Sequence, residues 1–91
     1  MKSTSVVGDP VIEGTAVVLR VAIEDPAHPE SGGVFVCRMA DYADIAVESF
    51  PPGQTPSSSG EDRVEAAACA MRYALENQGT FDTFFAELKA R

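Results

Sequence analysis

The sequence predicts an α+β fold in which a three-stranded antiparallel β-meander is followed by two α-helices packed on one face (β-β-β-α-α). The order of the periodic segments is the basis of this prediction. Segments with a period of two come first along the chain, and segments with apolar residues three and four positions apart come after them. Strands followed by helices favour an antiparallel sheet that is covered on one side.

Three segments have the alternation and the β-branched residues that are typical of strands, at residues 15–24, 34–40 and 43–50. Residues 25–33 contain two prolines and a glycine pair, which predict a long hairpin loop between the first two strands. One side of the sheet is expected to face the helices. Its apolar residues are Val17, Leu19, Val21, Ile23, Phe35, Cys37, Met39, Ile45 and Val47.

The beginning of the chain has no comparable period. Residues 1–12 are polar and are interrupted by Gly8, Asp9 and Pro10, so they predict a flexible N-terminal arm. A short edge pairing at Val6–Val7 is the alternative. The rest of the chain, residues 13–91, is expected to form a single α+β domain.

Residues 51–60 hold three prolines, two glycines and three serines, and they predict a loop. Helices are expected at residues 61–77 and 80–89, with Gly79 as a left-handed cap between them. The second helix would present Phe81, Phe84, Phe85 and Leu88 either to the sheet or to another chain. The packed face of the first helix is expected to comprise Val64, Ala67, Ala68, Met71, Ala74 and Leu75.

Charge and composition exclude several classes of function. Seven basic and fourteen acidic residues give a net charge of −7, so we expect neither nucleic acid nor an anionic membrane as a partner. No apolar stretch approaches the ~20 residues that cross a bilayer, and no secretory signal is visible. Cys37 and Cys69 have no short pair spacing, which favours reduced thiols in a cytoplasmic protein over a disulfide.

The residues offer no catalytic constellation, so we expect a protein that is not an enzyme and has no cofactor or metal site. His28 stands between two prolines near Glu24, Asp25 and Glu30. A small enzyme or metal-binding protein that uses this acidic loop is the alternative, although a solvated loop histidine is the favoured interpretation. Other carboxylates, at Asp41, Asp44 and Glu48, are expected to be surface charges, with Glu48 pairing with Arg20 or Arg38 across the sheet.

The sheet face turned away from the helices is the best candidate for a functional surface, because it combines small apolar residues with few charges. This pattern favours a protein–protein interaction module that binds an unknown partner protein or a second copy of itself. A solvated face, or one covered by the N-terminal arm, is the alternative. The expected interaction residues are Val18, Arg20, Val36, Arg38, Glu48 and Phe50.

A segment at the start of the first predicted helix, Gly60-Glu61-Asp62-Arg63-Val64-Glu65-Ala66-Ala67, follows three predicted strands. In this order it resembles the degraded ribonuclease-H-like domain of HicB-type antitoxins, over about half of the chain. The resemblance implies that this chain is the partner of a small toxin, which it embraces and neutralises. The chain departs from that family in two respects, since it lacks the Pro-Gly-Cys-like segment between strands and an appended DNA-binding element after the helix.

Overall fold

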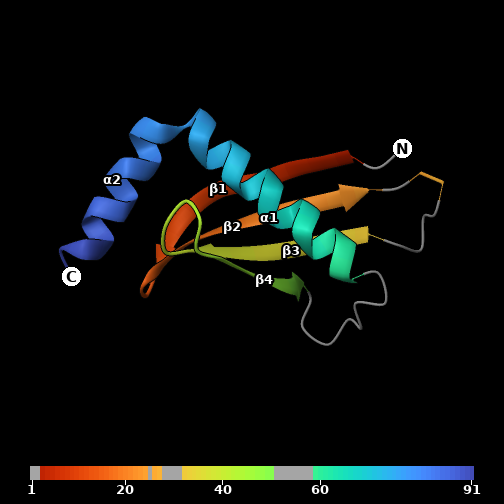
Figure 1. Cartoon of the computed structure of the whole chain (residues 1–91), viewed down its shortest axis with the longest axis horizontal. Helices are drawn as coiled ribbons and strands as arrows, with labels where there is room; N and C mark the ends of the chain where they lie inside the picture. The colour runs from red at the N-terminus through yellow and green to blue at the C-terminus, as the bar shows by residue number, and fades with distance from the viewer. Residues whose placement is uncertain (1–2, 25, 28–31, 51–58) are drawn as a thin grey trace.

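The computed structural model of the chain describes residues 3–24, 26–27, 32–50 and 59–91. It confirms an α+β fold in which the helices follow the strands and pack on one face of the sheet (Figure 1). The sheet has four strands rather than the expected three. The elements are β1 (Ser3–Glu13), β2 (Ala16–Glu24), β3 (Gly32–Met39), β4 (Ile45–Phe50), α1 (Ser59–Glu76) and α2 (Gln78–Lys89). Residues 51–58 of the predicted loop lie outside the described residues.

The four strands form an antiparallel meander in the order β1-β2-β3-β4. The additional strand, β1, corrects the expectation of a flexible arm at residues 1–12, because Ser3–Glu13 pairs along β2 from Ser3 opposite Glu24 to Glu13 opposite Ala16. The pairing at Val6–Val7 is therefore one part of a strand of 11 residues. Alternation alone did not reveal this strand, because a bulge interrupts it.

The bulge lies between Val7, which is opposite Arg20, and Val11, which is opposite Val18. Three residues of β1 therefore face the single residue Leu19 of β2. Gly8 has a φ of 76°, a left-handed conformation that glycine adopts without steric cost. Bulges of this kind bend an edge strand and make it a poor template for further pairing.

The core lies between the sheet and the helices, and the predicted helix-facing residues of β2 and β3 are all buried in it. Helix α1 lies close to the sheet because the residues that it turns inward are small. Ala66, Ala70 and Ala74 are fully buried, and the Sγ atom of Cys37 lies 3.8 Å from the carbonyl oxygen of Ala66. All buried side-chain nitrogen and oxygen atoms of the described residues have hydrogen-bond partners.

The expected packed face of α1 is wrong for three of its six residues. Val64, Met71 and Leu75 are 69%, 37% and 47% exposed, although Ala74 is buried as expected. The helix has two apolar stripes, and the stripe with the alanines packs inward because it allows the shorter distance to the sheet. The larger side chains consequently remain on the outside.

Helix α2 begins at Gln78, directly after Asn77, and its phenylalanines belong to the core. Phe81 is fully buried and its ring makes T-shaped contacts with Tyr73 at 5.9 Å and Phe84 at 5.7 Å. Phe85 is also buried, and its ring centroid lies 6.0 Å from that of Phe81. The choice between sheet and second chain is thereby decided for Phe81 and Phe85, which pack within the same chain.

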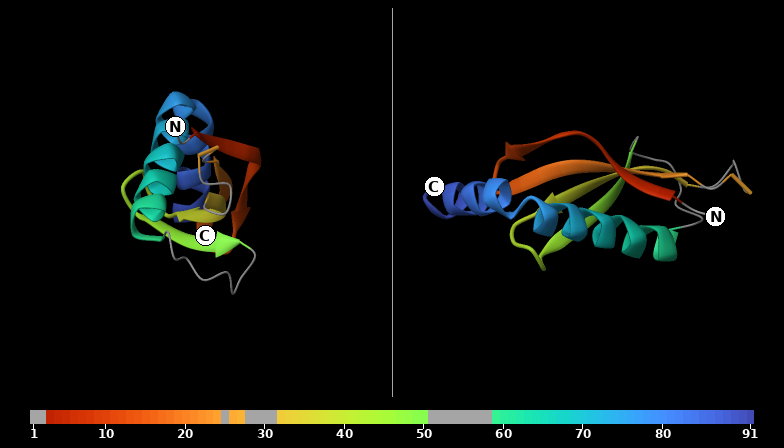
Figure 2. Two further views of the ribbon diagram at one scale, coloured as in Figure 1. Left: turned by 90° about the vertical axis from the view of Figure 1, so that its right-hand side faces the viewer. Right: turned by 90° about the horizontal axis from the view of Figure 1, so that it is seen from above.

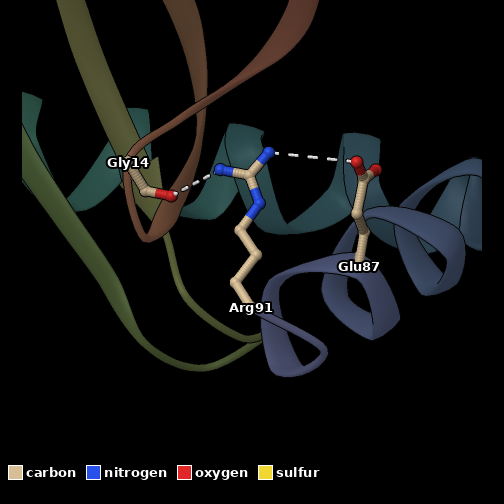
Figure 3. Close-up of polar contacts among 3 residues, drawn as sticks. All are labelled: Gly14, Glu87 and Arg91. Atoms are coloured by element: carbon tan, nitrogen blue, oxygen red, sulfur yellow. Dashed lines mark hydrogen bonds and ion pairs between the residues drawn. The ribbon is translucent and has the colours of Figure 1, made fainter.

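The C-terminal residue connects α2 to the turn between β1 and β2 (Figure 3). One guanidinium nitrogen of Arg91, Nη1, donates to the carbonyl oxygen of Gly14 at 3.2 Å, and Nη2 lies 3.9 Å from Oε1 of Glu87. These contacts are exposed to solvent, so each stabilises the fold by at most about 1 kcal/mol. They hold the end of α2 beside the hairpin of β1 and β2. The whole molecule measures 43 × 26 × 20 Å.

Two glycines are expected to respond oppositely to replacement by alanine. Gly14 opens the two-residue turn between Glu13 and Ala16 with a φ of 63°, as a type II′ turn requires, and Gly14→Ala should lower the free energy of unfolding by about 1–3 kcal/mol. Gly79 is a helical residue and not the expected left-handed cap, so Gly79→Ala should raise stability by about 0.5–1 kcal/mol. An added Cβ meets no atom within 4 Å at either position.

Urea denaturation of both variants measures this difference. The two changes serve as controls for each other, since both add the same methyl group in open space. Stabilisation by Gly14→Ala would contradict the turn geometry, and destabilisation by Gly79→Ala would contradict the start of α2 at Gln78.

Candidate interaction surface

The sheet face opposite the helices contains a hollow of about 550 Å³. It lies where the bulged edge strand β1 bends beside β2, and its lining extends across β3 to β4. The buried residues of α1 and α2 pack with the core side of β2 and β3, and Figure 2 shows α1 along the sheet and α2 beyond the ends of the strands, so no described helix covers the hollow. Its lining residues are Val7, Gly8, Asp9, Val11, Glu13, Val18, Leu19, Arg20, Val36, Arg38 and Glu48.

Most of the interaction residues expected from the sequence come together here. Val18, Arg20, Val36, Arg38 and Glu48 all line the hollow. Phe50 pairs with Val34 through its backbone at the end of β4, and its side chain lies outside the described part of the structure. The alternation of β2, β3 and β4 is sufficient to place these residues on one face.

Two cross-strand rows form the floor of the hollow. One runs from Val7 through Arg20 and Val36 to Glu48, and the other runs from Val11 through Val18 and Arg38 to Ala46. Val18, which belongs to the second row, is only 7% exposed. Val7 and Val11 on the edge strand are 47% and 50% exposed. The accessible apolar atoms of this surface are therefore contributed largely by β1.

An ion pair on this surface joins β3 and β4. Nε of Arg38 lies 3.7 Å from Oε2 of Glu48 on the neighbouring strand, which confirms the expected pairing of Glu48 with one of the two arginines. Both side chains are largely exposed, so this pair contributes at most about 1 kcal/mol to stability. Its two groups consequently remain available to a charged partner.

The contribution of β1 to the hollow was not predicted from the sequence. Val7, Gly8, Asp9, Val11 and Glu13 line it, and all belong to the segment expected to be an arm or to its end. The available signal was Gly14, a turn residue that separates two segments rich in β-branched residues.

The bulge of β1 also borders a second hollow, of about 270 Å³, beside the corner between α1 and α2. Its lining residues are Asp9, Pro10, Tyr73, Asn77, Thr80, Phe81 and Phe84.

The two cysteines are buried free thiols, at Cys37 in β3 and Cys69 in α1. Burial, together with the proximity of Cys69, raises the pKa of Cys37 from 9.0 to about 12. A thiol with such a pKa is almost fully protonated at neutral pH and is a poor nucleophile. Cys37 therefore acts as a small apolar core residue.

Metal binding by the acidic residues gains no geometric support from the described residues, among which no three histidine, cysteine, aspartate or glutamate side chains form a group able to hold an ion. Asp41 has a local role, since its Oδ1 accepts a hydrogen bond from the backbone nitrogen of Tyr42 at 2.7 Å in the connection between β3 and β4. His28 and Glu30, on which the metal or enzyme alternative depends, lie outside the described residues.

Tyr42 is the titratable group that connects this loop to α2. Its hydroxyl donates to Oδ1 of Asp82 at 2.5 Å, and its ring lies edge-on to Phe85 at 4.9 Å. The hydrogen bond to Asp82 and partial burial raise the pKa of Tyr42 from 10.0 to about 12. Because the folded pKa exceeds the unfolded one, the neutral phenol stabilises the fold fully below about pH 10, and this contribution is lost as the pH rises through about 12.

We expect a spectrophotometric titration to detect this shift. The difference between the wild-type curve and the curve of Tyr42→Phe should have a midpoint near pH 12, and Asp82→Ala should move that midpoint toward 10. A Tyr42 midpoint near 10 in the wild-type protein would contradict the contact with Asp82.

No helix among the described residues is both long enough and apolar enough to cross a membrane. Comparison of the chain with protein-family models, with curated proteins and with solved structures gives no match. Functional inference therefore depends on the surfaces of the molecule.

Proposed function

We propose that this chain is a non-catalytic protein–protein interaction module of the cytoplasm, and that it binds a partner protein on the open face of its sheet. The observation that supports this proposal is the hollow of about 550 Å³, in which exposed valines lie beside a solvent-exposed Arg38–Glu48 pair. Apolar patches bordered by polar residues are typical of protein-binding surfaces.

The chemistry of the surface favours a protein over other ligands. Its apolar part, formed by Val7, Val11 and Val36, suits an aliphatic or aromatic anchor of a partner. Its charged part has both signs, with Asp9 and Glu13 on the edge strand and Arg20 and Arg38 on the inner strands. A polyanion would be repelled by the acidic edge and by the net charge of −7.

Two alternative functions of this chain remain predictions. The resemblance to HicB-type antitoxins depends on residues 60–67, and it implies a small toxin as the partner. An enzyme or metal-binding protein would depend on His28, which belongs to the undescribed residues. The buried, protonated Cys37 favours the interaction module over a thiol enzyme.

Binding measurements with two matched valine variants test the proposal. Val11→Glu adds a charge to the hollow, whereas Val64→Glu adds the same charge to a more exposed valine on the opposite side of the molecule. A partner captured from cell extract by the immobilised wild-type domain is first identified and purified. Its affinity for each variant is then determined by calorimetry.

We expect Val11→Glu to weaken the complex by about tenfold or more, because a buried unpaired charge costs several kcal/mol at an interface. Val64→Glu should bind as the wild type does. Equal affinity of the Val11→Glu variant and the wild type would refute the open face as the binding surface. Selective loss in Val64→Glu would place the partner on α1 instead.

A further inference from the structure

The outward side of α1 has a continuous apolar stripe, which we call the outer stripe and define as Val64, Ala68, Met71 and Leu75. At 100° per residue these four side chains fall within about 60° of one another around the helix axis. They point away from Ala66 and Ala70, which pack on the sheet. Val64, Met71 and Leu75 are among the large hydrophobic residues that the described structure leaves exposed.

The spacing of the outer stripe is the same in both directions along the helix, since its members are separated by four, three and four positions. In an antiparallel pair of these helices, Val64 lies opposite the second chain's Leu75, and Ala68 lies opposite its Met71. Each large residue then faces a smaller one, which allows close packing. A surface of this kind is self-complementary under a two-fold axis.

We propose that the outer stripe is the docking site for a second copy of this chain, bound with its α1 antiparallel. The inference concerns a different face from the proposed partner site and does not depend on it. A second copy is the expected occupant because the charges beside the stripe are also complementary in an antiparallel pair.

Those charges are Glu65 and Arg72, which lie on the same flank of α1 and together line a shallow hollow with Thr4 and Ala68. Neither forms an ion pair with a described residue. In the antiparallel pair each Glu65 lies two residues, about 3 Å along the axis, from the second chain's Arg72. Two symmetry-related ion pairs, each between Glu65 of one chain and Arg72 of the other, therefore border the stripe. Complementary charges flank the apolar contact of paired helices in the same way.

The position of α1 permits this approach. Figure 2 shows α1 along the outside of the molecule, and Val64, Met71 and Leu75 on its outward side are exposed. An interface centred on one helix face is smaller than the roughly 800 Å² per partner of a standard complex. We therefore expect a weak dimer that forms at micromolar concentrations or above.

Sedimentation velocity of the full chain, over about 10 μM to 1 mM, measures the dimer directly. We expect the wild type to shift from monomer to dimer in this range. Arg72→Glu and Glu65→Arg should each weaken self-association by about tenfold or more, because each replaces both ion pairs by like-charge contacts. An equimolar mixture of the two variants should recover the dimer, since the acidic flank of one chain then meets the basic flank of the other.

Lys89→Glu is the matched control, because it makes the same charge change as Arg72→Glu at an exposed position of α2. It should leave the dimer unchanged. The recovery in the mixture also shows that both variants are folded. A wild-type monomer at every concentration would overturn the proposal, and so would a dimer that is insensitive to Arg72→Glu or that the mixture does not recover.

Discussion

Phe81→Ala is expected to lower the free energy of unfolding by about 3–5 kcal/mol, the cost of removing a large buried aromatic side chain. Phe81 is fully buried and its ring is surrounded by Tyr73, Phe84 and Phe85. Its loss leaves a cavity where α2 packs on the end of α1 and on β2. Because domains of this size are stable by about 5–15 kcal/mol, a large part of the total stability should be lost.

Urea denaturation followed by circular dichroism measures the change, with Leu75→Ala as the control. Leu75 is also a large helical side chain, but it is half exposed on the outer face of α1, so its truncation should cost about 0.5 kcal/mol or less. Similar stabilities of Phe81→Ala and Leu75→Ala would mean that α2 is not packed as described.

Ala70→Asp should be about equally damaging, at about 3–5 kcal/mol, because it buries a charge without a partner beneath α1. Ala70 is fully buried between the helix and the sheet, at the same depth as Ala66. The helix would have to move away from the sheet to hydrate the carboxylate, and the contact between the Cys37 thiol and the Ala66 carbonyl oxygen would be lost.

Val64→Asp provides the comparison, and it also decides which stripe of α1 faces the sheet. The side chain of Val64 is largely exposed, so an aspartate there should change stability by no more than about 0.5 kcal/mol. Helical spacing alone assigns Val64 to the packed face and predicts the reverse order of the two variants. Thermal unfolding of both proteins is sufficient to distinguish the two assignments.

The strands β2, β3 and β4 and both helices were predictable because each has a complete local pattern. Period two in β2 placed Val17, Leu19 and Val21 on the core side, and all three are buried. The same alternation placed Arg20, Val36 and Arg38 on the open face, where they line one hollow. Successive side chains of a strand point to opposite faces of the sheet, so the face of each residue follows from the strand's own sequence and does not depend on the partner strand.

Strand β1 and the inward face of α1 were not predictable in this way. In β1 the bulge after Val7 interrupts the alternation, and the segment becomes a strand only because β2 supplies its hydrogen-bond partners. In α1 both stripes have helical spacing, so periodicity alone does not separate them. Residue size pointed toward Val64, Met71 and Leu75, whereas packing distance favoured the alanines.

By itself, then, the sequence determined the fold class, the order of strands and helices, and the open-face position of Val18, Arg20, Val36, Arg38 and Glu48, because all of these follow from local periods. Only the tertiary structure decided that residues 3–13 pair with β2, that β1 borders the hollow, and that the outer stripe of α1 remains exposed. These features depend on distances between segments that are far apart along the chain. The volume available between helix and sheet selects alanine over valine or leucine, and no single segment contains that information.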